Sequence, residues 1–487
     1  MFDKDTIAAI ATGLTDSGIG IIRISGSKAA EIGDRVFRLP SGKRFFNHGA
    51  SHQLQYGFAI DEENDFVIDE VMAVVMRSPR SFTGEDTVEI QCHGGVFVMN
   101  KILETVLKCG ARLAEPGEFT KRAFLNGKVD LSGAEAVMDV IHSQNEAALA
   151  FSVSQLKGSL CEKVKKLRSD IIYEIAFIES ALDDPEHISL EGYPEGLAEK
   201  VGRLLKDIHK MIDTAHDGRL IKEGINTVIV GKPNAGKSSL LNCIVGEERA
   251  IVTEVAGTTR DILTESIRLG NINLNIVDTA GIRETEDTVE KIGVERAKKY
   301  AEGADLILYV VDASVDLDEN DEKIAEFIKD KKVIVLLNKS DLESRVTENG
   351  IIELFGKNIK DEGNKPDHLN RSNGISIDGD SHIYIIKTSA KENKGIDLFE
   401  HIVKDIFFHG EIRSSNEIII TNMRHKEALQ EAYDSLLLVK RSIEDGMPED
   451  FYSIDLMSAY AALGRIIGEE VDDDLVEEIF SKFCMGK

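Results

Sequence analysis

The spacing of apolar residues predicts a mixed α/β region over residues 1–122. Strand-like apolar runs occur at Gly20–Ile24, Val71–Met76 and Thr87–Gln91, and turn-forming residues separate them. Gly94-Gly95 then leads into Val98–Leu107, whose apolar positions have the spacing of a helix. This region is therefore expected to be an α+β domain.

A long helical pattern begins near Phe124. Apolar residues three and four positions apart lie on one face of a helix, and such a face is usually buried. The positions of this kind are Leu160, Val164, Leu167, Ile171, Ile175, Ile178 and Leu182. A similar pattern returns after residue 409, at Leu429, Tyr433, Leu436, Leu456, Ala459, Leu463 and Ile466.

Residues 221–408, between these helical regions, alternate strand-like and helical segments. The simplest topology is a helical bundle interrupted by an inserted α/β domain, because insertions are tolerated at exposed loops whose ends lie close together. We expect a surface loop or local disorder over most of the polar stretch 343–381. The predicted domains are 1–122 (N-terminal), 123–220 (helical, first part), 221–408 (inserted α/β) and 409–487 (helical, second part).

Composition narrows the class of protein. The 487 residues are 42% apolar and 30% charged, and the formal net charge of −28 argues against a broad surface for nucleic-acid phosphates. The cysteines are scattered without a CxxC pair, so neither a disulfide framework nor a zinc site is indicated. Neither a signal peptide nor an apolar run long enough for a membrane span is present, and we expect a cytoplasmic protein.

A phosphate-binding motif follows the strand-like run Ile225–Val230. Residues Gly231–Ser238 fit GxxxxGKS/T between a strand and a helix, which is the context that confirms such a motif. The backbone of this loop would surround the phosphates, Lys237 would reach the β- and γ-phosphates, and the Ser238 hydroxyl would ligate Mg²⁺. The residues predicted to bind nucleotide here are Asn234, Ala235, Gly236, Lys237, Ser238 and Ser239.

Further motifs occur in the order expected of a guanine-nucleotide site. Asp278, Thr279, Ala280 and Gly281 form a DxxG element after a strand, and Thr259 is the natural switch-loop ligand for Mg²⁺. Asn338, Lys339 and Asp341 form an NKxD element, in which the Asp341 carboxylate can accept both N–H groups of guanine. Adenine offers neither donor, so the site selects GTP. Ser389, Ala390 and Lys391 complete the pocket by analogy with other GTPases.

The residue that orients the attacking water is left open by these motifs. Ile282 occupies the position where many GTPases have a Gln, and it cannot hydrogen-bond to water. Arg283, Glu284, Glu286 and Glu290 are the candidates downstream. An arginine finger supplied by this chain is not obvious, although Arg260 and Arg283 remain open.

The motifs together resemble the MnmE (TrmE) family of tRNA-modification GTPases over the full length. The resemblance rests on Gly231–Ser239, Thr253–Asp261, Asp278–Gly281 and the final Phe483–Lys487. It also includes the N-terminal segments Arg23–Gly26, Phe82–Asp86, Pro116–Phe119 and Arg122–Asn126. Two features depart from the family: Met485 replaces the usual Ile, and the stretch 343–381 is longer than expected.

The resemblance implies a fold and a set of ligands. The N-terminal domain would be similar to folate-binding domains, would form the homodimer and would bind 5-formyl- or methylene-tetrahydrofolate. The inserted domain would be a Ras-like P-loop GTPase domain. The implied folate residues are Arg23, Glu89, Lys128 and Lys487, and Cys484 is a candidate catalytic residue.

The resemblance also implies how GTP is used. G domains of the family pair across a K⁺ ion, here with Asn234, Thr253, Val255 and Thr258 as ligands, and the same Thr253–Thr258 loop borders the nucleotide. The water-positioning glutamate of the family falls on Glu290. With the flavoprotein MnmG (GidA), in a heterotetramer or larger assembly, the family adds a carboxymethylaminomethyl or aminomethyl group to C5 of the wobble uridine of tRNA.

Two other classes of GTPase compete with this interpretation. A ribosome-assembly switch would be expected to carry a basic RNA-binding module, but Glu469–Glu478 is strongly acidic. A signalling or scaffold GTPase would have no use for a folate-like N-terminal domain. Co-purification of a flavoprotein and binding of tetrahydrofolate would separate the leading hypothesis from both.

Overall fold

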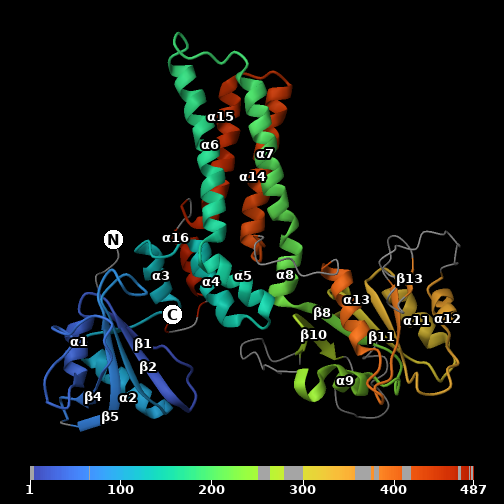
Figure 1. Ribbon diagram of the computed structural model, residues 1–487, viewed down its shortest axis with the longest axis horizontal. Coiled ribbons are helices and arrows are strands. Elements are labelled where there is room, and N and C mark those ends of the chain that lie inside the picture. Colours follow the sequence, from blue (N-terminus) through green and yellow to red (C-terminus); the bar gives the residue numbers. More distant parts are fainter. Residues whose placement is uncertain are drawn as a thin grey trace. The chain divides into compact units, whose positions relative to one another are not determined.

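The computed structural model divides the chain into two compact units, and each contains a β-sheet (Figure 1). The first unit comprises Met1–Ile141, Ser152–Ile208 and Ala428–Lys487, and the second comprises His142–Phe151 and His209–Glu427. The described residues are 5–64, 66–249, 264–278, 300–356, 375–377, 383–408, 418–469, 473–481, 483 and 486.

The first unit begins with a largely antiparallel sheet. Its described strands lie in the order β3-β4-β5-β6-β2-β1-β7, in which β1 and β7 pair in parallel. The strands are β1 (Ile7–Ile10), β2 (Ser17–Ser25), β3 (Phe37–Arg38), β4 (Gln55–Asp61), β5 (Phe66–Met76), β6 (Thr87–Gly94) and β7 (Arg112–Leu113).

The two faces of this sheet are buried by different partners. Because side chains alternate along a strand, Ala8 and Ile10 of β1 enter a core with residues of α1 (Ala29–Val36) and α2 (Val96–Lys108). Ile7 and Ala9 face the other way, toward Phe119 of α3 (Glu118–Leu125). The predicted strands and the predicted helix of this region are all present, within β2, β5, β6 and α2.

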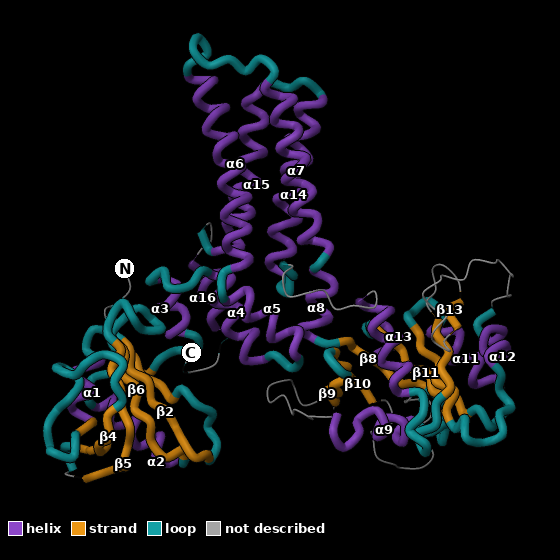
Figure 2. The backbone as a smooth tube through the Cα atoms, viewed as in Figure 1, coloured by secondary structure: helices purple, strands orange, loops and turns teal. Residues whose placement is uncertain are grey.

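The first unit also contains the long helices α6 and α15, most of α4, α7 and α14, and α16 (Figure 2). Helix α6 packs against α15 and forms ion pairs with α7, and Arg465 of α15 pairs with Glu431 of α14. The helices outside the sheet domain are α4 (Leu131–His142), α5 (Glu146–Leu156), α6 (Ser159–Asp183), α7 (Tyr193–Asp213), α14 (Met423–Glu444), α15 (Glu449–Ile467) and α16 (Asp473–Ser481).

The predicted apolar face of α6 is buried along most of its length. The positions from Leu160 to Ile178 are at most 5% exposed, as the helical period requires. Leu182 is 44% exposed, so its assignment to the buried face was wrong. Its position in the last turn of α6, beside the connection to α7, explains the exposure.

The second unit contains a mainly parallel sheet. Its described strands lie in the order β13-β14-β12-β11-β8-β10-β9, with β9 and β13 antiparallel to their neighbours. The strands are β8 (Ile225–Val230), β9 (Thr264–Leu269), β10 (Ile272–Asp278), β11 (Leu306–Asp312), β12 (Val333–Asn338), β13 (Ile375–Ile377) and β14 (Ile383–Lys387). The helices are α8 (Ala215–Glu223), α9 (Lys237–Arg249), α11 (Glu319–Ile328), α12 (Glu348–Leu354) and α13 (Ile396–Phe408).

Both faces of the parallel strands are covered. In β11, Leu306, Leu308 and Val310 join the core that includes α9 and α13, whereas Tyr309 and Val311 join the core that includes α11 and α12. Strands buried on both sides read as continuous apolar runs, which is why β8, β12 and β14 were recognisable in the sequence.

Part of the polar stretch 343–381, over most of which we expected a loop, is regular structure. Helix α12 begins after Thr347, whose hydroxyl accepts a hydrogen bond from the Gly350 backbone, and Ile351 and Ile352 are buried. Strand β13 pairs with β14. The segments 357–374 and 378–382 lie outside the described residues. Within the described parts of both units, none of the helices has the length and apolarity to cross a membrane.

Candidate functional site

The phosphate-binding motif joins the end of β8 to the start of α9. Asn234 has a positive φ of 62° and Gly236 one of 93°, so the loop turns back on itself before Lys237 begins the helix. The Lys237 ammonium donates to the carbonyls of Gly231 and Lys232, both at 2.8 Å. Ser238 and Ser239 follow in the first turn of α9 and are exposed. A helix N-terminus with such a loop is suited to binding phosphate.

The predicted base-recognition residues lie together at the ends of β12 and β14. Ser389 Oγ donates a hydrogen bond of 2.7 Å to Asp341 Oδ1. That hydrogen bond lowers the pKa of Asp341, and the positive charges of Lys391 and Lys394 add to the effect. The carboxylate is therefore ionised and acts purely as an acceptor at neutral pH, as recognition of two N–H donors requires.

Asn338 connects the base-recognition loops to the phosphate loop. Its side-chain amide donates to the Ala235 carbonyl at 3.0 Å, and its side-chain oxygen accepts from the Ala390 backbone at 3.3 Å. A Cβ on Gly236 would lie 2.2 Å from the Asn338 amide nitrogen, so a side chain there would displace this bridge. Three predicted motifs thus meet at one buried amide, since Asn338 is 2% exposed.

Asp312 supports this site but was not predicted from the sequence. It ends β11 directly opposite Asn338 of β12 and forms a 2.5 Å ion pair with Lys339. Although burial acts to raise the pKa of Asp312, hydrogen bonds from Lys339 and Ser314 lower it. One feature of the sequence could have identified Asp312. It is the acidic residue that ends the apolar strand β11, which pairs with the strand that leads into the NKxD motif.

A second unpredicted group anchors the phosphate loop to α11. Lys232 forms ion pairs with Asp321 at 2.6 Å and with Asp318 at 3.1 Å. Asp318 caps the N-terminus of α11, and buried Asp321 also accepts from Tyr309 Oη at 2.7 Å. The pKa of Tyr309 is raised, by burial first and then by this carboxylate. The loop is therefore tied to both β11 and α11.

The predicted metal ligands are only partly within the described residues. Ser238 is exposed at the start of α9, and Asp278 ends β10 beside Ile229 of β8, so the backbone brings both positions to the same edge of the sheet. The other residues predicted for nucleotide, metal or water lie outside the described residues: Thr253, Val255, Thr258, Thr259, Thr279, Ala280, Gly281 and Glu290.

Arg23 and Glu89 form an ion pair in the first unit. They are opposite each other on β2 and β6, with Arg23 Nε 2.8 Å from Glu89 Oε1. The Arg23 guanidinium lies 5.6 Å from the ring centres of Phe82 and Phe119. Both side chains retain exposure, 18% for Arg23 and 17% for Glu89, so the pair is accessible to a ligand.

The C-terminal motif also reaches Arg23. The Gly486 carbonyl accepts a hydrogen bond of 3.3 Å from Arg23, and a Cβ on Gly486 would lie 2.3 Å from the Ile10 carbonyl. Glycine is needed there because its φ is 92° and the backbones are in close contact. Cys484 and Lys487 lie outside the described residues. Lys128 contacts a neighbouring loop, donating to the Pro79 carbonyl at 3.0 Å.

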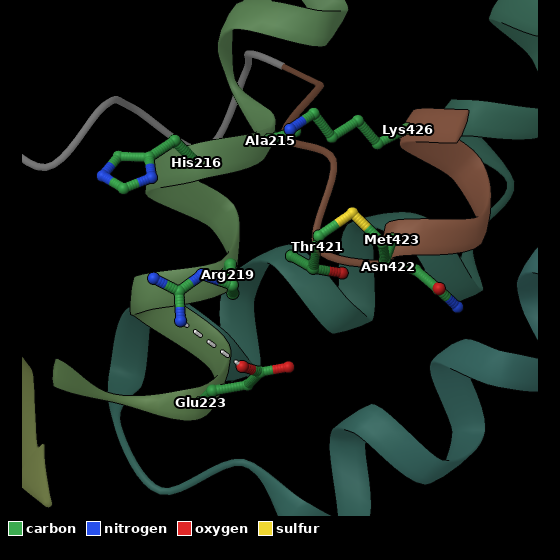
Figure 3. A pocket seen from close by; sticks show the side chains of 8 residues that line it. All are labelled: Ala215, His216, Arg219, Glu223, Thr421, Asn422, Met423 and Lys426. Atoms are coloured by element: carbon green, nitrogen blue, oxygen red, sulfur yellow. Dashed lines mark ion pairs between the residues drawn. The ribbon is translucent and has the colours of Figure 1, made fainter. Parts of the chain in front are cut away.

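A small cavity in the second unit does not fit the predicted ligands. It lies between α8 and residues 421–426, and Figure 3 shows Arg219 beside Glu223 in its wall. Its volume of about 70 Å³ is far below the roughly 300 Å³ at which ligand pockets begin. Arg219 is also paired with Asp305 at 2.8 Å. We therefore assign the cavity to helix packing.

Family models and curated relatives match nearly the whole chain. Residues 6–128 match the family described as "GTP-binding protein TrmE N-terminus", and residues 131–484 match "MnmE helical domain". A "tRNA modification GTPase MnmE" of Lachnoclostridium phytofermentans is 56% identical over 483 residues, which are 99% of each chain. Its namesake in Acetivibrio thermocellus is 46% identical over the full length of both chains.

Solved structures add little to this comparison. A variant of Era from Aquifex aeolicus, bound to GDP·AlF4⁻, is 29% identical and covers 44% of this chain and 67% of its own, with a TM-score of 0.25. A TM-score this low supports no conclusion about this chain. The full-length identities and the family matches, by contrast, show that the chain is a GTP hydrolase belonging to the MnmE family of tRNA modification GTPases.

Proposed function

We propose that this enzyme uses GTP hydrolysis to drive addition of a carboxymethylaminomethyl or aminomethyl group to C5 of the wobble uridine of tRNA. Its partner in this reaction is the flavoprotein MnmG (GidA), in a heterotetramer or larger assembly in the cytoplasm. The observation that carries the proposal is the Asn338 bridge between Ala235 and Ala390, because it joins the phosphate-binding motif to the base-recognition motifs in a chain of this family.

Residues of the second unit hold GTP in this proposal. The carboxylate of Asp341 accepts the two guanine N–H groups, and Ser389 keeps that carboxylate in place. The Lys237 ammonium gives up its hydrogen bonds to the loop carbonyls and donates to the β- and γ-phosphates instead. The backbone N–H groups from Asn234 to Ser239 also donate to the phosphates. Thr279, Ala280 and Gly281 border the γ-phosphate, and Lys339 and Lys391 flank the base.

Two metal ions fit the oxygen donors of this site. The exposed Ser238 hydroxyl suits Mg²⁺, with Thr259 and Asp278 completing the protein ligands. The Asn234 side chain and the loop residues Thr253, Val255 and Thr258 suit K⁺, bound where two G domains pair. When bound, these cations supply positive charge that stabilises the phosphate oxygens in the transition state.

Glu290 positions the water that attacks the γ-phosphorus. A carboxylate is an acceptor for both water protons, which aims an oxygen lone pair at the phosphorus. The P–O bond to the β-phosphate then breaks, and GDP and phosphate are the products. Ile282 cannot take this role because its side chain has no polar atom.

The first unit contributes dimerisation and a folate site. We assign residues 1–122 to a folate-binding-like domain, 123–220 and 409–487 to the helical domain, and 221–408 to the G domain. The partly exposed Arg23–Glu89 pair offers a donor and an acceptor to the polar edge of 5-formyl- or methylene-tetrahydrofolate, and two aromatic rings flank it. Lys128, Lys487 and Cys484 complete the proposed site.

The decisive experiment measures GTP hydrolysis in KCl and in NaCl at matched ionic strength. The wild type should be strongly stimulated by K⁺, and Glu290→Ala should lose that stimulation because the water is no longer oriented. Glu284→Ala and Glu286→Ala are matched controls that remove a neighbouring carboxylate. Equal wild-type rates in the two salts would exclude the K⁺ mechanism, and a fully active Glu290→Ala would return the choice to Arg283, Glu284 or Glu286.

A further inference from the structure

Charges are segregated along the hairpin that α6 and α7 form in the first unit. Its basal half, residues 157–170 and 200–208, contains eight Lys or Arg and three Asp or Glu. Its other half, residues 171–199, contains eight Asp or Glu and neither Lys nor Arg. On a chain with a net charge of −28, the basal half is a local excess of positive charge.

Two ion pairs fix the register of the hairpin. Lys163 pairs with Asp207 at 2.6 Å, and farther along Glu174 pairs with Lys200 at 2.5 Å. Lys166 lies one turn after Lys163 on α6, and Arg203 lies one turn before Asp207 on α7, so both positions belong to the seam between the helices. Figures 1 and 2 show the two helices antiparallel and joined at the far end of the hairpin.

Several basal cations lack an acidic partner among the described residues. Lys163 and Lys200 are engaged in the register pairs, and Arg168 is buried between Tyr460 and Glu469. By contrast, the structure shows five exposed basic residues that form no ion pair within the part of the chain that it describes. They are Lys157, Lys165, Lys166, Arg203 and Lys206, and we call them the basic seam.

We propose that the basic seam binds the phosphate backbone of tRNA. Lys and Arg that are not neutralised within the protein gain free energy by displacing the counterions of a polyanion. A protein this acidic repels RNA over most of its surface, so contact must be confined to a patch of this kind. The acidic half of the same hairpin then limits how far along the helices the RNA can lie. The inference rests on the proposed role in tRNA modification.

The contact is to phosphates and not to bases. The seam offers flexible ammonium groups and a guanidinium at exposed positions, and its residues include none of the aromatic side chains that stack on unpaired bases. Binding should therefore depend on salt and be nearly independent of tRNA sequence. Selection among tRNAs would belong to other parts of the assembly.

The test measures binding of a fluorescently labelled tRNA transcript to the full-length protein between about 50 and 200 mM KCl. The double variant Lys166→Gln/Arg203→Gln should bind more weakly and lower the slope of log K against log salt by about two. The affinity ratio of wild type to variant should consequently shrink by about tenfold across that range. Lys440→Gln/Arg441→Gln, on α14 of the same bundle, is the matched control for charge loss and should behave as the wild type.

Several outcomes would overturn the proposal. They are wild-type binding by the test variant, an equal loss in both variants, or no binding of tRNA by the wild type. If the test variant binds tRNA as the wild type does but captures less of the flavoprotein, the seam is instead a binding surface for the flavoprotein. Circular dichroism and GTP hydrolysis of each variant distinguish these outcomes from misfolding and from failure of the GTPase assignment, because the seam lies outside the nucleotide site.

Discussion

Asp341 offers the sharpest test among single residues of the nucleotide site. In the proposed site its carboxylate, held by Ser389, would accept two N–H groups from guanine, whereas an Asn amide would present one donor and one acceptor. Xanthine has a carbonyl in place of the guanine 2-amino group and so complements the amide. In Asp341→Asn we expect the KM for GTP to rise by at least about tenfold, as a lost hydrogen bond to a charged group implies.

The same variant should hydrolyse xanthosine triphosphate, which steady-state kinetics with both nucleotides would detect. Asp316→Asn, an exposed carboxylate paired with Arg345, is the control and should leave nucleotide preference unchanged. Retention of GTP preference by Asp341→Asn would place base recognition elsewhere.

Residues that belong to short motifs could be predicted from the sequence, and their supporting residues could not. Asn338, Asp341 and Ser389 carry recognisable spacing. Asp312 and Asp321 are separated by 27 and 89 positions from the lysines they hold, so only the folded sheet brings each pair together. The Arg23–Glu89 pair meets for the same reason, across the β2–β6 register.

Helix α11 and the phosphate loop should be energetically coupled through Lys232. Removing its ammonium leaves the buried Asp321 carboxylate without its cation, and lost hydrogen bonds of this type cost about 1.5–3 kcal/mol. We expect Lys232→Met to lower both the free energy of unfolding of the second unit and the affinity for GTP. Thermal unfolding and titration with a fluorescent GTP analogue would measure these changes.

Lys323 on the exposed side of α11 provides the matched comparison, and Lys323→Met should alter neither quantity. If Lys232→Met binds GTP as tightly as the wild type, the anchor serves stability alone. Loss of GTP affinity in both variants would point to a general effect of charge.

Elements were predictable from the sequence where their apolar pattern is long or doubly buried. Helix α6 repeats its pattern over several turns, and β8 and β12 are continuous apolar runs. Helix α12 was missed because its buried residues, Ile351 and Ile352, fill a single turn within a polar stretch. Two-residue strands such as β3 and β7 exist only through pairing with distant strands, which local sequence does not encode.

The whole molecule should unfold in two steps, because each unit has its own buried cores. Only the second unit contains the nucleotide site, so GDP with Mg²⁺ should raise the temperature of one calorimetric transition and leave the other unchanged. At a ligand concentration of about 100 Kd the stabilisation would be about 2.7 kcal/mol. A single transition that shifts as a whole would show that the units unfold cooperatively.

The segregated charges of the α6–α7 hairpin also have a consequence for the approach of RNA. Opposite charge at the two ends of a rod creates an electric dipole along its axis, so a polyanion exerts a torque on the protein before the surfaces touch. The order of the charges therefore matters as well as their sum. Exchanging acidic and basic residues between the two halves would keep the net charge at −28 and still reverse the orientation in which the first encounters occur.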